Sequence, residues 1–142
     1  MQEPMDLREV RHVSVTISRS PADVYAFVSA VENLPSWAAG LCETVRKGGD
    51  GWVGEGPLGE VKLRFTEPND LGVLDHDVEV ASGMTLHNPI RVVPNGAGSE
   101  LTFTVFRRPG LSPQEFAADA GAVERDLRKL KTILEYAPSA AR

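Results

Sequence analysis

Two polar residues stand on the apolar faces of consecutive predicted strands, and both could do chemistry. Residues 72–80 alternate, and His76 shares its face with aliphatic side chains, the pattern of a strand with one face on the core. Asn88 lies in the same way within residues 84–93. Histidine can exchange protons near neutral pH, and an asparagine amide can hold an enolate oxygen or orient a carbonyl. The two residues could therefore serve acid–base catalysis, or orient the polar groups of a bound molecule.

A polar group on an apolar face costs about 1–3 kcal/mol unless it finds a partner. His76 and Asn88 therefore either line a cavity or bond to one another and fix the strand register, and the sequence leaves both interpretations open. Pro89 follows Asn88 directly. A bulge at this proline would turn the Asn88 side chain outward.

The remaining candidate groups do not combine into a site. His12 and His87 have the parity of exposed faces, and no predicted helix carries histidines four residues apart, so we expect no metal site and no cofactor. Cys42 is the only cysteine, which excludes an internal disulfide and favours a semi-buried filler. The glycine-rich segments 48–51 and 54–59 precede strands rather than helices, so they are hairpin loops and not phosphate cradles.

Composition limits the partners of the chain. Its 142 residues are 42% hydrophobic and 25% charged, as in an ordinary soluble domain. The net charge is −5 and no basic cluster is present, so nucleic acid is not an expected partner. No apolar run approaches the ~20 residues of a membrane span, and the N-terminus lacks a signal-peptide core. We expect a cytoplasmic protein, either a monomer or a homodimer.

The elements that position His76 and Asn88 follow from local signals. Residues 10–18 alternate as a first strand, and Ser20 and Pro21 cap and begin a helix. A second short helix is expected at 35–38. The remaining expected strands are 41–47, 52–56, 60–67, 72–80, 84–93 and 99–107.

A long amphipathic helix closes the chain. Ser112 and Pro113 begin it, and the pattern continues to Tyr136. Its apolar stripe consists of Phe116, Ala120, Val123, Leu127, Leu130 and Leu134. The charged residues of the segment, Asp126 among them, mostly fall on other faces. The order predicts a single α+β domain over residues 1–142, with a core of about 10–136, in which six or seven antiparallel strands curve around this helix.

This order resembles the START-like superfamily, also called the Bet v 1-like or SRPBCC fold. Residues 13–25 look like the first strand and helix of the family, and residues 32–37 look like its short second helix, which ends on a tryptophan. The closing helix looks like its C-terminal lid. Within the superfamily the chain looks most like small bacterial polyketide cyclase/dehydrase proteins. The resemblance covers about residues 10–136 and implies a helix-grip fold with an internal cavity for a lipophilic ligand.

Inward parity selects the side chains expected to line this cavity, and the two tryptophans are expected at its rim. The expected ligand-binding residues are Trp37, Trp52, Leu63, Phe65, Leu74, His76, Leu86, Asn88, Phe103, Phe116, Ala120, Val123 and Leu127.

Three functions remain open on the sequence alone. The first is binding of a small lipophilic, aromatic or polyketide-like molecule, with His76 and Asn88 orienting its polar groups. The second is a cofactor-independent cyclase, dehydratase or isomerase that uses His76 as its acid–base group and Asn88 as the oxyanion donor. The third is a protein-interaction module, as in the chaperone activators of the superfamily.

Overall fold

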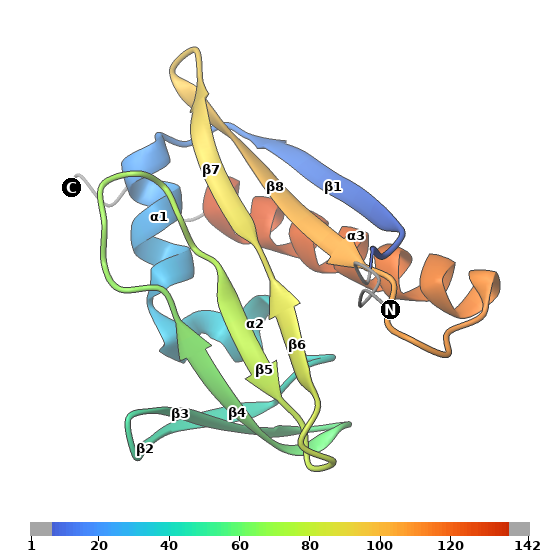
Figure 1. The fold of residues 1–142 in the computed structure, drawn as a ribbon. Coiled ribbons are helices and arrows are strands. Elements are labelled where there is room, and N and C mark those ends of the chain that lie inside the picture. The colour runs from blue at the N-terminus through green and yellow to red at the C-terminus, as the bar shows by residue number, and fades with distance from the viewer. Residues whose placement is uncertain (1–6, 137–142) are drawn as a thin grey trace.

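The computed structural model describes residues 7–136 and shows an antiparallel sheet combined with a long C-terminal helix (Figure 1). The chain begins with β1 (Val10–Ile17), α1 (Pro21–Ser29), the short helix η1 (Val31–Asn33) and α2 (Leu34–Trp37). The strands β2 (Thr44–Gly48), β3 (Gly51–Gly56), β4 (Gly59–Phe65), β5 (His76–Glu79), β6 (Thr85–Asn88), β7 (Ile90–Asn95) and β8 (Gly98–Phe106) follow, and α3 (Pro113–Tyr136) closes the fold. The predicted α+β class is confirmed. Residues 1–6 and 137–142 of the expected domain lie outside the described residues.

The strands pair in the orders β1-β8-β7 and β2-β3-β4-β5-β6. The two groups meet at Pro89, which has no N–H to donate and so separates β6 from β7. Its carbonyl still accepts the Thr104 N–H at 3.0 Å. Asn88 pairs with His76 on one side of the proline, and Arg91 bridges Val73 on the other. Both pairings have the same register, so no residue is inserted at Pro89 opposite β5, and Asn88 keeps its predicted face.

Two strands begin later than their alternation predicts. Residues 41–47 were expected as a strand, but the N–H groups of Leu41 and Cys42 both donate to the Ala38 carbonyl, at 2.9 and 3.2 Å. The chain therefore still turns there, and β2 begins at Thr44. In the same way, only residues 76–79 of the expected strand 72–80 form a regular ladder.

The long helix α3 packs on β1 and also contacts β8 and α2; Figure 1 shows it lying behind β8 and β1. Its predicted stripe is buried at Phe116, Ala120, Leu127, Leu130 and Leu134. Val123 is only partly buried. None of the helices between residues 7 and 136 combines the length and the apolarity that crossing a membrane requires.

Side-chain caps fix the start of α1 and of α3, as predicted. The Ser20 hydroxyl accepts the Asp23 N–H at 3.1 Å. At α3 the Ser112 hydroxyl accepts the Glu115 N–H at 3.1 Å, while the Glu115 carboxylate accepts the Ser112 N–H at 2.8 Å. This reciprocal pair is a capping box, which satisfies two N–H groups that the first turn leaves free.

Replacing Ser112 with alanine is expected to lower the free energy of unfolding by about 1 kcal/mol, because one half of the capping box is lost. Urea denaturation measures the change. Ser14→Ala is the matched control, since Ser14 is exposed in the middle of β1, and it should change stability by less than about 0.5 kcal/mol. Equal losses in both variants would show that the box contributes nothing.

Candidate ligand-binding cavity

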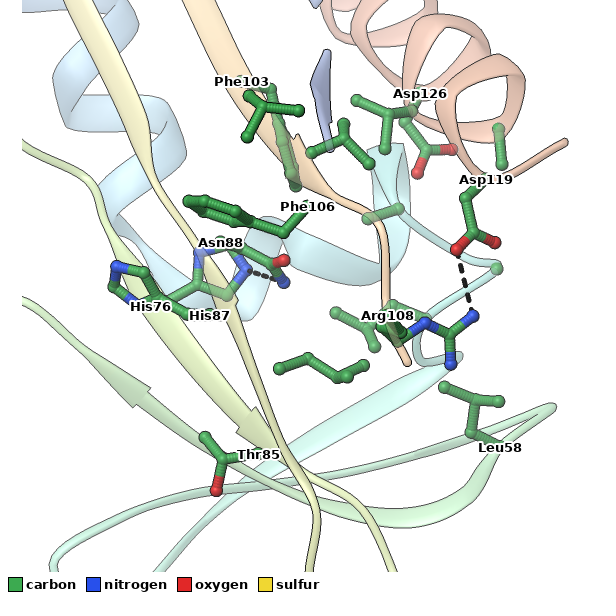
Figure 2. Close-up of a pocket in the computed structure, with 18 of the residues that line it drawn as sticks. Leu58, His76, Thr85, His87, Asn88, Phe103, Phe106, Arg108, Asp119 and Asp126 are labelled. Atoms are coloured by element: carbon green, nitrogen blue, oxygen red, sulfur yellow. Dashed lines mark hydrogen bonds and ion pairs between the residues drawn. The ribbon is translucent and has the colours of Figure 1, made fainter. Parts of the chain in front are cut away.

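A cavity of about 990 Å³ lies between the sheet, α2 and the first half of α3 (Figure 2). This volume is at the upper end of the range for small-molecule sites. Its apolar wall includes Leu34, Trp37, Ala38, Leu41, Leu86, Phe103, Val105, Phe106, Ala122 and Val123. The inner face of the sheet and the helices thus leave an open space between them.

His76 and Asn88 lie side by side in this wall. Their pairing across β5 and β6 places the Asn88 Nδ2 3.4 Å from the His76 Nε2 (Figure 2). The His76 ring stacks on Phe65, with 4.6 Å between centroids and 14° between planes, and lies edge-on to Phe103 at 6.4 Å. Only 3% of His76 is exposed. The two residues therefore bond to one another and also line the cavity, which joins the two interpretations that the sequence left open.

Burial lowers the pKa of His76 to about 4, because a charged imidazole is poorly solvated there. The ring is consequently neutral near neutral pH. A proton on Nδ1 satisfies both of its contacts, since Nδ1 then faces the Leu74 carbonyl at 3.5 Å and Nε2 accepts from the Asn88 amide. His76 thereby fixes the orientation of the Asn88 amide. The Asn88 Oδ1 and one N–H keep no partner among the described residues.

Sequence reasoning missed Asp126 as a residue of the cavity wall. It lines the cavity from α3 together with Asp119 and Val123, at steps of four and three residues that place all three on one helix face. Asp126 forms no hydrogen bond or ion pair within residues 7–136. Burial raises the pKa of its carboxyl to about 6, and the nearby charges of Arg125 and Lys129 oppose that shift. The spacing that places Asp126 beside Val123 was present in the sequence, but the apolar stripe alone does not select it.

Charged and exposed groups surround the opening of the cavity. Arg108 forms an ion pair with Asp119 at 3.0 Å (Figure 2), and Arg8 and Arg125 are further cavity residues. Leu58, in the turn between β3 and β4, also lines the cavity and is exposed. The opening thus combines apolar surface with cationic side chains.

Six of the thirteen expected ligand-binding residues line the cavity: Trp37, His76, Leu86, Asn88, Phe103 and Val123. The other seven are Trp52, Leu63, Phe65, Leu74, Phe116, Ala120 and Leu127. Leu63, Leu74 and Leu127 are buried in the core. Phe65 lies against His76, and Trp52 packs under Lys47, whose ammonium is 5.7 Å from the ring centroid. Phe116 and Ala120 are buried members of the α3 stripe.

The other candidate groups have ordinary surroundings. His12 is exposed, and its Nδ1 is 3.2 Å from the Thr104 hydroxyl. His87 is also exposed, pairs with Asp77 at 2.6 Å and reaches the cavity opening. Within the described part of the chain, no three His, Cys, Asp or Glu side chains gather so that they could hold a metal ion. Burial raises the pKa of the Cys42 thiol to about 11, which keeps it protonated.

The family model described as polyketide cyclase / dehydrase and lipid transport matches residues 10–135, and the chain belongs to this family. The resemblance to the START-like superfamily is thereby confirmed. No curated protein matches the chain in sequence.

Solved structures share the fold at low sequence identity. The Aha1 dimer from Colwellia psychrerythraea is 15% identical, with a TM-score of 0.73 over 90% of this chain and 97% of its own. Protein MLL2253 from Mesorhizobium loti is 12% identical, with a TM-score of 0.72 over 92% and 99%. DynU16, a putative protein in the dynemicin biosynthetic locus, is 14% identical, with a TM-score of 0.69 over 94% of this chain and 48% of its own. At these identities the likeness shows the fold alone.

Proposed function

We propose that the protein binds a small, largely apolar molecule in the cavity between the sheet and α3. The observation that carries this proposal is the open volume of about 990 Å³ behind an apolar wall. Sites for small molecules are concave and mostly apolar, with volumes of about 300–1,000 Å³, so a space of this size and lining favours an occupant. The description of the family, which includes lipid transport, supports the same conclusion.

Within this function, Asn88 orients the polar group of the ligand. One of its N–H groups is held by His76, and its Oδ1 and remaining N–H are open toward the cavity. Such an amide can accept from a hydroxyl or donate to a carbonyl. His76 acts behind Asn88 as a positioning residue.

A cofactor-independent cyclase, dehydratase or isomerase is the second candidate function, and the family description favours it. In that reaction His76 would exchange a proton with the substrate. Its pKa of about 4 and the engagement of both ring nitrogens favour the binding function instead, because His76 would first have to release Asn88. The open cavity also favours a small-molecule ligand over a protein-interaction module.

Blocking the cavity tests the proposal. Ala122 lines the cavity from α3, so Ala122→Trp places an indole in the open space and should reduce ligand affinity at least about tenfold, or about 1.4 kcal/mol. Stability should change little, because the ring enters a void rather than a packed core. The assay incubates purified protein with a host small-molecule extract and follows retained and transformed compounds by mass spectrometry.

Ala118→Trp is the matched control, since Ala118 is exposed on the same helix. It should retain the same compounds as the unmodified protein. A compound retained unchanged by the unmodified protein and Ala118→Trp, and lost in Ala122→Trp, supports binding. Conversion to a cyclised or dehydrated product supports the enzyme. Retention by both tryptophan variants alike would contradict a ligand site in this cavity.

A further inference from the structure

Three buried or half-buried side chains of the cavity wall carry a polar group that has no hydrogen-bond partner among the described residues. The groups are the indole N–H of Trp37, the Oδ1 of Asn88 and the carboxylate of Asp126. Within residues 7–136, no side-chain nitrogen or oxygen is both inaccessible and unbonded, so these groups are reachable although Trp37 is only 3% exposed. Because these groups face accessible space, an occupant of the cavity could bond to them, and their chemistry indicates which donors and acceptors it would carry.

Asp126 is the one acidic residue of α3 that has neither a hydrogen bond nor an ion pair among the described residues. Glu115 accepts the Ser112 N–H at 2.8 Å. Glu124 pairs with Arg128 at 2.7 Å, and Glu135 pairs with Lys131 at 2.7 Å. Asp119, on the same cavity face as Asp126, pairs with Arg108 at 3.0 Å. Figure 2 shows Asp119 and Asp126 on α3, across the cavity from Asn88 on the sheet. Asp126 is thus the one acid of this helix whose carboxylate has no hydrogen-bond or ion-pair partner among the described residues.

The chemistry of the missing partner follows from the carboxylate. An ionised carboxylate can only accept hydrogen bonds, and a hydroxyl offers it one donor without charge. An ammonium group offers up to three donors together with the opposite charge, which gives a stronger bond. The net charge of −5 adds a long-range attraction for a cation. Three arginines of the cavity lining oppose this attraction. Arg108 opposes it less than Arg8 and Arg125 do, because Asp119 neutralises Arg108.

We propose that the cavity takes a lipophilic amine whose ammonium group binds the Asp126 carboxylate. The apolar part of the molecule lies against the wall that includes Phe103, Phe106 and Val123. This inference rests on the proposed function and names the class of ligand for the same cavity. It assigns a role in specificity to Asp126, which is separate from the His76–Asn88 pair.

Displacement of a neutral dye tests the inference. Nile red is bound to the protein at pH 7.5, and decylamine and decanol are compared as competitors of equal chain length. Decylamine should displace the dye at about tenfold lower concentration than decanol, the size of one charge-assisted hydrogen bond. Asp126→Asn should abolish the difference while the dye still binds. Glu124→Gln, which removes a charge of α3 outside this cavity, should preserve it.

Acidification gives an independent readout. Because the pKa of Asp126 is about 6, its carboxylate gains a proton between pH 7.5 and 5, and the advantage of decylamine should disappear over that range. The other charged or titratable groups around Asp126 are Arg125 and Lys129 on α3, the Arg108–Asp119 pair, and the cavity residues His87 and Arg8. Because Asp126→Asn has no carboxyl at this position, its relative affinity for decylamine and decanol should not change between pH 7.5 and 5. A dependence that persists in this variant would assign the effect to another group and overturn the proposal.

The outcomes separate the two proposals. If Nile red binds and both decyl compounds displace it equally, the amine inference is wrong and the ligand cavity stands. If neither the dye nor a decyl compound binds the unmodified protein, both proposals are wrong. If Asp126→Asn fails to fold, Asp126→Glu, which keeps the charge, should retain the preference for decylamine, and its loss there would also overturn the inference.

Discussion

Replacing His76 with alanine is expected to lower the free energy of unfolding by about 3 kcal/mol. The His76 ring is almost fully buried, stacked on Phe65 and edge-on to Phe103. Alanine removes both aromatic contacts and also removes the acceptor of the Asn88 amide. Urea denaturation at pH 7 measures the change.

The phenylalanine variant separates packing from hydrogen bonding at this position. His76→Phe keeps a ring between Phe65 and Phe103 but cannot accept from Asn88, so we expect a loss of less than about 1.5 kcal/mol. Both variants should weaken ligand binding, because the Asn88 amide is no longer held. His12→Ala is the control, since His12 is exposed, and it should cost less than about 0.5 kcal/mol. A His76→Ala protein as stable as this control would contradict a supporting role for the ring.

The pH dependence of stability gives His76 a second signature. Its pKa in the folded protein is about 4, below the ordinary value of 6.5, so between these values the unfolded chain binds more protons than the folded one. Stability is therefore lost as the pH falls from 6.5 to 4, by up to about 3 kcal/mol. His76→Phe should lack this contribution. The same acid sensitivity in the variant would show that other groups cause it.

Much of the fold could be predicted because its signals are local. The sequences around Ser20 and Ser112 contain a cap, a first-turn proline and an acidic residue within a few positions, and both helices begin there. Strand boundaries were less certain, because long-range bonds decide them. The Ala38 carbonyl delays β2 by accepting two N–H groups, and alternation in residues 41–47 contains no sign of those bonds.

For the candidate site, the sequence could predict only which face of a strand or helix each side chain lies on. Parity placed His76 and Asn88 on one face, and the strand register then made them neighbours. It could not separate the cavity wall from the filled core, so Leu63 and Leu127 were expected beside Leu86 and Val123. That separation depends on how the sheet curves and where α3 lies, and alternation carries no information on either. Asp126 was missed because a charged residue on a helix is usually solvated.

The Asp126 carboxylate is expected to lower the stability of the free protein at neutral pH while it contributes to ligand binding, and one substitution tests both effects. Its carboxyl has a pKa of about 6 in the folded protein, above the ordinary value of 3.8. Between these values the folded state binds more protons than the unfolded chain, so the stability contributed by the neutral carboxyl is present below pH 3.8 and lost as the pH rises through 6. At pH 7 the fold therefore carries an ionised, half-buried carboxylate that has no ion pair within residues 7–136.

Asp126→Asn is expected to raise the free energy of unfolding at pH 7 by about 1–2 kcal/mol, after allowance for the solvent that reaches this partly buried group. Near pH 4 the variant and the unmodified protein should be almost equally stable, because Asp126 is then neutral, and the protonation of His76 affects both alike. Urea denaturation at the two pH values measures the difference. Glu124→Gln should show no gain, since it removes an exposed ion pair with Arg128. If Asp126→Asn both stabilises the free protein at pH 7 and abolishes the preference for decylamine, then Asp126 serves ligand binding at the expense of stability. Equal or lower stability of Asp126→Asn at pH 7 would instead show that the carboxylate is already well solvated, and the cavity would then have no need of a cation.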